Sequence, residues 1–216
     1  MKSHFEILKQ LLDEKIIAIV RLDSAEHLVK VAEALKAGGI SAIEFTLSTA
    51  GALDMVKEAS ARFSDEALIG AGTVLDPETA RAAILAGAEF IVTPTFNPAT
   101  IEMCKRYGKP IVAGAMTPTE TLTAWQAGAD LIKVFPVNVI GGPDYIKSVL
   151  APLPQLRLVP TGGVNADNAA SYLKAGAVAV AVGGSLADKS AVARGDWTAI
   201  TAEAQRLVSA VRNGPK

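Results

Sequence analysis

Short apolar segments recur at nearly constant intervals along this chain, and this regularity limits the folds that the chain can adopt. Between the segments lie stretches rich in Ala, Glu, Lys and Leu, in which apolar residues follow the i, i+3, i+4 spacing of amphipathic helices. The apolar segments are 16–20, 42–45, 68–70, 90–92, 110–113, 131–135, 157–159 and 177–182. Eight strand–helix units of similar length predict an α/β protein with a single (β/α)₈ barrel, the TIM-barrel architecture.

An open, doubly wound sheet is the alternative that this spacing leaves. The dinucleotide-binding versions of that fold carry Gly-x-Gly-x-x-Gly after the first strand, but the chain reads Arg-Leu-Asp-Ser at 21–24. No change of composition interrupts the series, so we expect one barrel domain over 1–216. Within it, 1–15 would form an extra N-terminal helix (His4 to Glu14), 16–187 the strands and catalytic loops, and 188–216 a C-terminal helix and tail.

Charge and cysteine content exclude several classes of function. The formal net charge is −1, which gives no basic surface for nucleic acid or an anionic membrane. The N-terminus lacks the apolar core of a signal peptide, and no apolar run approaches the roughly 20 residues that span a bilayer. Cys104 is the single cysteine, and together with His4 and His27 it gives too few ligands for a His/Cys metal site. We expect a cytoplasmic protein that needs no metal.

Lys133 lies inside the apolar segment 131–135, which reads as a buried strand. Burial disfavours the charged form of a lysine, and a neutral lysine is a nucleophile that can form a Schiff base with a ketone or an aldehyde. A lysine that extends its ammonium group to the strand end is the structural alternative. The other polar residues of the strands therefore decide between the two interpretations.

Polar side chains gather near the C-terminal ends of the predicted strands, where a barrel of this type builds its active site. They are Arg21, Glu44, Thr46, Thr73, Thr93, Lys133, Thr161 and Ser185. At the opposite ends only Lys109 and Arg157 stand out, and we expect both to be solvated strand starts.

Strand alternation predicts that Lys133 and Glu44 point into the barrel. Lys133 shares a face with Leu131 and Phe135, whereas its two immediate neighbours are aliphatic and suit the helix layer. Glu44 likewise lies between two apolar neighbours. A buried structural ion pair is the alternative, although such pairs are an unreliable source of stability. We favour a Schiff-base lysine with a carboxylate that moves protons, directly or through one water.

The last two strand ends resemble an anion site. Each carries a glycine pair followed by a predicted helix turn, in 160–165 (PTGGVN) and in 182–186 (VGGSL). Glycine allows backbone N–H groups to approach a phosphate, and the loops after the seventh and eighth strands are the usual phosphate site of these barrels. A glycine pair alone also serves an ordinary turn. Two pairs in these two units together indicate a phosphate site.

These motifs together resemble the 2-keto-3-deoxy-6-phosphogluconate (KDPG) and 4-hydroxy-2-oxoglutarate (KHG) aldolases. The resemblance runs from about residue 16 to about residue 187. Its carriers, in order, are EFTL at 44–47, GAGTV at 70–74, IVTP at 91–94, KVFP at 133–136, PTGGV at 160–164 and VGGS at 182–185. It implies a class I lyase on a (β/α)₈ barrel that cleaves a 2-keto-3-deoxy-6-phospho sugar acid to pyruvate and glyceraldehyde 3-phosphate. It also implies a homotrimer and no cofactor beyond the Schiff base.

The resemblance also implies a role for each matching residue. Lys133 would form the Schiff base and Glu44 would be the general acid and base. The pyruvyl part and its carboxylate would be bound by Arg21, Thr46, Thr73, Pro94, Phe135 and Thr161. The phosphate would be bound by Gly162, Gly163, Gly183, Gly184 and Ser185.

One position departs from the common family pattern. Many members carry an arginine four residues after the catalytic glutamate, but this chain has Ser48 there. Arg21, at the end of the first strand, is the obvious substitute, as in the related 6-phosphogalactonate aldolases. A rim arginine paired with Asp23 or Glu44 is the structural alternative. The departure leaves the preferred C4 epimer open.

Three other functions remain compatible with the sequence. A phosphosugar isomerase or synthase would share the glycine-rich loops but would not need Lys133. A non-catalytic barrel would use Lys133 and Glu44 as an ion pair. An aldolase acting mainly on 4-hydroxy-2-oxoglutarate, giving pyruvate and glyoxylate, would share the catalytic pair.

Overall fold

The computed structural model describes residues 2–23 and 25–213 and contains eight strands and their helices. The strands are β1 (Ile16–Val20), β2 (Ala42–Thr46), β3 (Leu68–Gly72), β4 (Phe90–Val92), β5 (Ile111–Ala115), β6 (Leu131–Val134), β7 (Leu158–Pro160) and β8 (Val180–Val182). The helices are α1 (His4–Glu14), α2 (Leu28–Ala37), α3 (Ala52–Phe63), α4 (Pro77–Leu85), α5 (Pro98–Arg106), α6 (Pro118–Gln126), η1 (Val137–Val139), α7 (Gly142–Leu150), α8 (Ala169–Lys174), α9 (Lys189–Ala193) and α10 (Trp197–Asn213). Of the predicted ends of the chain, residue 1 and residues 214–216 lie outside the described residues.

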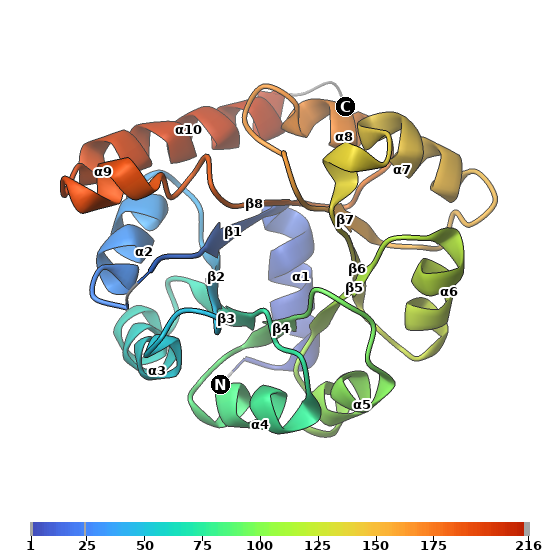
Figure 1. Ribbon diagram of the computed structural model, residues 1–216, viewed down its shortest axis with the longest axis horizontal. Helices are drawn as coiled ribbons and strands as arrows, with labels where there is room; N and C mark the ends of the chain where they lie inside the picture. Colours follow the sequence, from blue (N-terminus) through green and yellow to red (C-terminus); the bar gives the residue numbers. More distant parts are fainter. Residues whose placement is uncertain (1, 24, 214–216) are drawn as a thin grey trace.

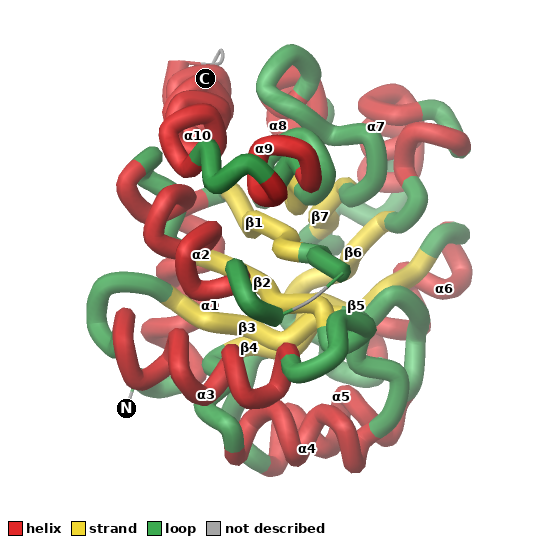
Figure 2. Tube along the Cα trace, turned by 60° about the vertical axis from the view of Figure 1, so that its left-hand side comes forward, coloured by secondary structure: helices red, strands yellow, loops and turns green. Residues whose placement is uncertain are grey.

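The strands form a closed ring. They are parallel, in the order β7-β6-β5-β4-β3-β2-β1-β8, and a parallel bridge between Thr161 and Ala181 joins the two ends of this series. Figures 1 and 2 show the helices arranged around the ring. The prediction of a (β/α)₈ barrel is confirmed. Strand ends differ from the predicted ones by up to three residues; the last predicted segment, for example, pairs with β1 only from Val180.

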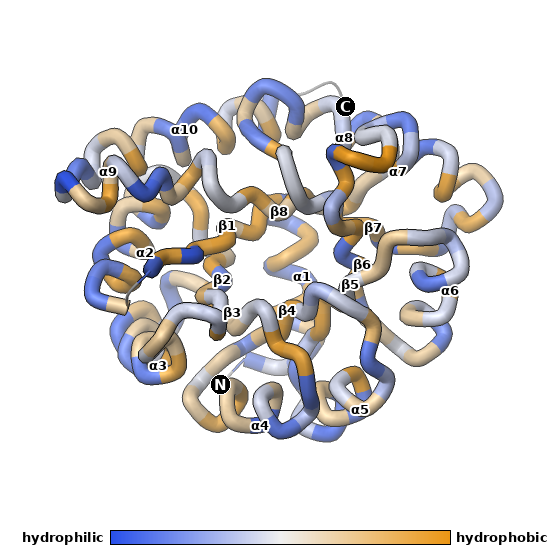
Figure 3. Tube along the Cα trace, in the orientation of Figure 1, coloured by the Kyte–Doolittle hydropathy of each residue, from blue (hydrophilic) through white to orange (hydrophobic). Residues whose placement is uncertain are grey.

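Two apolar layers stabilise the ring, because successive side chains of a strand point to opposite faces. One layer lies between the strands and the surrounding helices, and Ile43, Phe45, Ile132 and Val134 belong to it. The other fills the inside of the ring, with side chains such as Phe90. Hydrophobic residues line β1 and β8 in Figure 3, and polar residues recur on the helices around them.

Helix α1 closes the N-terminal end of the ring, as its position across the centre of Figure 1 shows. Its apolar residues Ile7 and Leu11 are fully buried against the interior layer. Ser3 and Glu6 form a capping box that satisfies free N–H groups at the start of the helix. His4 Nε2 lies 2.8 Å from Asp130 Oδ1, just before β6. In the described residues, α1 thus covers the N-terminal end of the barrel interior, and the C-terminal ends of the strands lie opposite it.

Of the two basic residues at the N-terminal strand ends, Lys109 differs from expectation. Lys109 is only 7% exposed, so its prediction as a solvated strand start is wrong. The turn after α5 folds back, with Lys109 N–H donating to the Cys104 carbonyl, and this carries the side chain close to Glu89. Arg157 is half-buried and its guanidinium lies 5.9 Å from the centre of the Trp125 ring. In the described part of the chain, no helix has the length and apolar character needed to cross a membrane.

Candidate active site

Glu44 lies inside the barrel, in space that Gly72 of the next strand leaves open. In the β2–β3 register Glu44 is opposite Gly70 and Thr46 is opposite Gly72. A Cβ on Gly72 would fall 1.7 Å from Glu44 Oε1, and one on Gly70 would overlap the Phe90 ring at 2.4 Å. Any side chain larger than hydrogen at residue 72 would therefore displace the carboxylate.

The Glu44 carboxylate is buried without a partner. Its exposure is 0%, and neither oxygen has a hydrogen-bond partner among residues 2–23 and 25–213. The hydrogen-bonded ion pair with Lys133, considered from the sequence, is thus not formed. Burial raises the pKa of the Glu44 carboxyl, although the positive charges of Lys133 and Arg21 act in the opposite direction. A carboxyl in this state can take up and release a proton at a pH above its usual range.

This burial predicts a pH-dependent stability difference between the protein and Glu44→Gln. A carboxyl with a raised folded-state pKa favours folding below its unfolded pKa, and this contribution is lost as the pH rises through the folded pKa. Glutamine has the same shape but no charge. We expect Glu44→Gln to have the higher melting temperature at pH 8–9, by about 2–4 °C for each 1 kcal/mol that the charge costs.

Melting curves from pH 4 to pH 9 provide the measurement. The difference between the two proteins should shrink as the pH falls toward the ordinary glutamate pKa of about 4.3. Glu58→Gln, on the exposed face of α3, is the matched control and should show no such trend. Equal melting temperatures of Glu44→Gln and the unmodified protein at all pH values would contradict the unpartnered carboxylate.

Lys133 lies on β6, across the ring from Glu44, and is 5% exposed. It pairs in register with Gly114 of β5 and Val159 of β7. Its ammonium nitrogen lies 5.3 Å from the centre of the Phe135 ring, which directly follows the strand. β6 ends at Val134, one residue earlier than predicted, and Phe135 is 37% exposed. The amine thus lies at the base of the barrel mouth, with an aromatic ring beside it.

A cavity of about 700 Å³ opens above Lys133 at the C-terminal ends of the strands. It brings together ten of the thirteen site residues predicted from the sequence. These are Arg21, Pro94, Lys133, Phe135, Thr161, Gly162, Gly163, Gly183, Gly184 and Ser185. The volume suits a ligand of the size of a phosphorylated sugar acid.

Arg21 and Thr73 meet at one side of this mouth. Arg21 Nη2 donates to Thr73 Oγ1 at 3.4 Å. Thr73 has a φ of 57°, in the left-handed region that β-branched residues rarely adopt, and this places its hydroxyl toward Arg21. Asp23, the alternative partner of Arg21, pairs with Lys189 instead. A cation and a hydroxyl side by side are suited to binding a carboxylate.

The backbone after β7 takes a left-handed conformation at two successive residues, which favours glycine at both. Gly162 and Gly163 have φ values of 100° and 70°. A Cβ on Gly163 would also lie 2.8 Å from the Asn138 side chain. Asn168 Nδ2 donates to the Gly163 carbonyl at 2.9 Å and so holds the loop. Because the carbonyl of Gly163 is engaged in this way, the loop can present N–H groups to the cavity.

The structure separates some predicted residues from the cavity and adds others. Glu44, Thr46 and Thr73 do not line it. Glu44 is fully buried, Thr73 contacts the lining residue Arg21, and the Thr46 hydroxyl is buried and donates to the Val20 carbonyl at 3.5 Å. Two charged residues of the cavity wall, Asp188 and Lys189, were not predicted. Their positions in the sequence could have indicated this, since both follow the second glycine pair within a few residues. In the described residues, no group of three or more His, Cys, Asp or Glu side chains is arranged to hold a metal ion.

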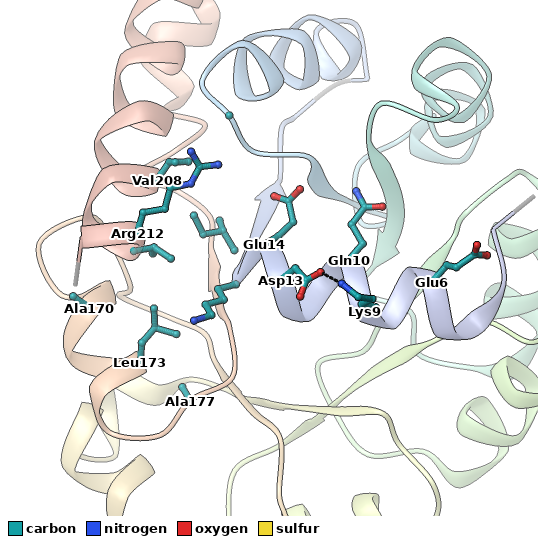
Figure 4. Close-up of a pocket in the computed structure, with 14 residues that line it drawn as sticks. Glu6, Lys9, Gln10, Asp13, Glu14, Ala170, Leu173, Ala177, Val208 and Arg212 are labelled. Atoms are coloured by element: carbon teal, nitrogen blue, oxygen red, sulfur yellow. Dashed lines mark hydrogen bonds and ion pairs between the residues drawn. The ribbon is translucent and has the colours of Figure 1, made fainter. Parts of the chain in front are cut away.

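A second cavity, of about 780 Å³, lies at the N-terminal end of the barrel between α1, α8 and α10 (Figure 4). Its charged residues are largely engaged with other side chains: Lys9 pairs with Asp13, and Glu14 accepts a hydrogen bond from Ser41. Apolar residues such as Val208 and Leu173 line the rest. None of the predicted site residues reaches this cavity.

Comparison with known proteins is consistent with this geometry. Residues 7–203 match the family model described as KDPG and KHG aldolase. The 2-dehydro-3-deoxy-phosphogluconate aldolase of Treponema pallidum is 34% identical over 211 residues, which are 98% of this chain and 99% of that protein. A solved structure described as native KDPGal superposes with a TM-score of 0.85 at 32% identity, covering 92% of this chain and 95% of that one.

A third relative carries chemical information. The KDPG aldolase of Legionella pneumophila was solved with pyruvate captured at low pH as a covalent carbinolamine intermediate. It superposes with a TM-score of 0.82 at 30% identity and covers 89% of this chain and 92% of that one. A carbinolamine is the adduct that forms when an amine attacks a ketone, before water is lost.

Proposed function

Because this chain belongs to the KDPG and KHG aldolase family, we propose that it is a class I aldolase in which Lys133 forms the Schiff base. The reaction cleaves a 2-keto-3-deoxy-6-phospho sugar acid to pyruvate and glyceraldehyde 3-phosphate. The observation that carries the assignment of residues is a buried lysine at the base of the barrel mouth, with an unpartnered, buried carboxyl from the opposite side of the ring. A phosphosugar isomerase or synthase has no use for this pair.

The proposed reaction begins when the lone pair of Lys133 Nζ attacks the C2 ketone of the substrate. The carbinolamine loses water and becomes an iminium, which draws electrons from the neighbouring C3–C4 bond. Glu44 takes the proton of the C4 hydroxyl through a water molecule as this bond breaks, and glyceraldehyde 3-phosphate leaves. The remaining enamine is protonated at C3, and hydrolysis of the resulting imine releases pyruvate and the free lysine.

The two ends of the substrate have separate binding groups in this proposal. Arg21 and Thr73 bind the carboxylate, so that the ketone meets Lys133 in a fixed orientation. The phosphate is bound by the Ser185 hydroxyl and by backbone N–H groups of the two glycine loops, including those at Gly162 and Gly184. Binding at the phosphate supplies free energy for positioning the reacting atoms. Arg21 thereby replaces the arginine that is absent at Ser48.

Trapping with borohydride tests the class I assignment. Sodium borohydride added with pyruvate should reduce the imine and attach a pyruvyl-derived mass to the peptide that contains Lys133. Activity should persist in EDTA, because the iminium supplies the electron sink and we propose no metal. An unlabelled Lys133, or activity that EDTA abolishes, would overturn the mechanism.

The substrate itself needs a direct comparison. Cleavage of the gluconate- and galactonate-derived epimers, measured side by side, assigns the C4 preference that Arg21 and Ser48 leave open. 4-Hydroxy-2-oxoglutarate is a second candidate because the family includes KHG aldolases. A lower kcat/KM for 4-hydroxy-2-oxoglutarate than for both phosphorylated epimers is expected if the glycine loops bind phosphate.

We further propose that the enzyme is a cytoplasmic homotrimer. A reducing compartment suits the single thiol, Cys104, which is buried and whose pKa burial raises to about 12. Exposed apolar side chains at the C-terminal rim support contact between subunits. They are Leu75, Met116 and Val139, with 58%, 37% and 66% of their surface accessible.

A further inference from the structure

Three cationic side chains line the cavity in the described part of the chain, and the reaction proposed above uses only two of them. Lys133 forms the Schiff base, and Arg21 lies with Thr73 on the carboxylate side. The third is Lys189, the first residue of α9. It follows the second glycine pair in the same loop that carries Ser185, and so belongs to the phosphate side of the cavity.

Among the described residues that line the phosphate side of the cavity, Lys189 is the one positive side chain. A phosphate ester carries close to two negative charges at neutral pH, and the glycine loops offer only neutral N–H groups. The helices after the two glycine pairs, α8 and α9, are six and five residues long, so few peptide dipoles align toward the cavity. Asp188 adds a negative charge, since hydrogen bonds from Ser190 and the Ala191 N–H hold the pKa of its carboxyl below the usual value. A cation on this side of the cavity would offset these negative charges.

Lys189 currently pairs with Asp23, at 2.6 Å. Both side chains are largely exposed, 60% for Lys189 and 86% for Asp23. Exposed pairs of this kind contribute at most about 1 kcal/mol, whereas a charge-assisted hydrogen bond to a phosphate is among the strong interactions of proteins. An incoming phosphate can therefore displace the Asp23 carboxylate from the lysine.

We propose that Lys189 binds the phosphate ester of the substrate and that Asp23 holds it at the cavity wall in the free enzyme. The exchange links two loops, because Asp23 follows Arg21 after β1 and Lys189 follows the glycine pair after β8. This inference rests on the proposed function, since it presupposes a phosphorylated substrate.

The experiment compares kcat/KM for a 6-phosphorylated 2-keto-3-deoxy sugar acid with kcat/KM for its unphosphorylated form. The ratio of the two values should fall about tenfold or more in Lys189→Ala, mainly through KM for the phosphorylated substrate. Lys189→Arg should restore most of the ratio. Lys57→Ala, an exposed lysine on α3 away from the cavity, should leave the ratio unchanged. An unchanged ratio in Lys189→Ala would overturn the proposal.

Asp23→Asn separates a phosphate ligand from a structural tie between the two loops. If Lys189 serves the phosphate, removing its competitor should leave KM for the phosphorylated substrate equal or lower. If the ion pair only holds the loops together, Asp23→Asn should raise KM as Lys189→Ala does, and the proposal fails. Trapping of pyruvate by borohydride in each variant keeps the two proposals distinct. If the unmodified enzyme traps no pyruvate, the aldolase mechanism is refuted. If Lys189→Ala traps pyruvate normally and its KM for the phosphorylated substrate is unchanged, only the role of Lys189 is refuted.

Discussion

Lys133→Ala should be folded and should lose essentially all turnover, with kcat/KM reduced at least about 10⁴-fold. The reason is that no other described lysine lines the barrel mouth except the exposed Lys189, so nothing replaces the nucleophile. Because Lys133 lines the cavity, the space that its side chain leaves joins that cavity and forms no closed void, so the melting temperature should stay close to that of the unmodified protein. Initial rates, pyruvate trapping with borohydride, and a melting curve on the same sample make the measurement.

Lys109→Met is the matched control for this loss. Lys109 is also a buried lysine of the barrel, but it precedes β5 at the N-terminal ends of the strands, away from the cavity. The Lys109→Met variant should still trap pyruvate at Lys133. Trapped pyruvate in Lys133→Ala, on any other lysine and with turnover preserved, would show that Lys133 is not the nucleophile.

Glu44→Gln should lower cleavage by about 10²–10⁴-fold, the usual contribution of a positioned acid or base. Glutamine fits the same space beside Gly72 but cannot accept the C4 hydroxyl proton. Formation of the imine with pyruvate should be reduced less than cleavage, because attack by Lys133 does not break the C3–C4 bond. Single-turnover cleavage and borohydride trapping, measured in parallel, separate the two steps. Cleavage at the original rate would remove Glu44 from the mechanism.

Gly72→Ala tests whether the position of this carboxylate matters as well as its presence. The backbone of Gly72 does not lie in the left-handed region, so alanine is tolerated by the chain itself, at an overpacking cost of about 1–3 kcal/mol. The new methyl group would overlap Glu44 Oε1 and displace it, and a displacement of about 1 Å can lower the rate about 10²-fold. Added to Glu44→Gln, the same substitution should lower cleavage little further, since the displaced base is already gone. Additive losses would contradict this coupling.

Much of the site was predictable because strand alternation is a local property. The apolar neighbours of Lys133 and Glu44 belong to the helix-facing layer in the structure, as their period of two predicted. The glycine pairs were readable for the same reason, since residues 162 and 163 need backbone conformations that glycine supplies. The chemical roles of these residues stay predictions until the variants above are measured.

Other features depended on contacts that no local pattern encodes. Thr46 was expected to bind substrate, yet its hydroxyl is turned to the Val20 carbonyl of the neighbouring strand. Lys109 was expected in solvent, yet the turn after α5 buries it near Glu89. Each outcome follows from where a neighbouring segment of the chain lies, which the spacing of apolar residues does not specify.

The sequence by itself determined the number of strands, the barrel class and the inward orientation of Lys133 and Glu44, because hydrophobic periodicity and turn residues act over a few neighbouring positions. Only the tertiary structure decided how deep each polar group lies and which partner it has. Glu44 lies where it does because Gly72, on another strand, leaves room for its carboxylate, and Lys189 pairs with Asp23, 166 positions earlier in the chain. Burial and pairing are set by segments that are distant in sequence and close in space, and they decide the charge state on which the proposed chemistry depends.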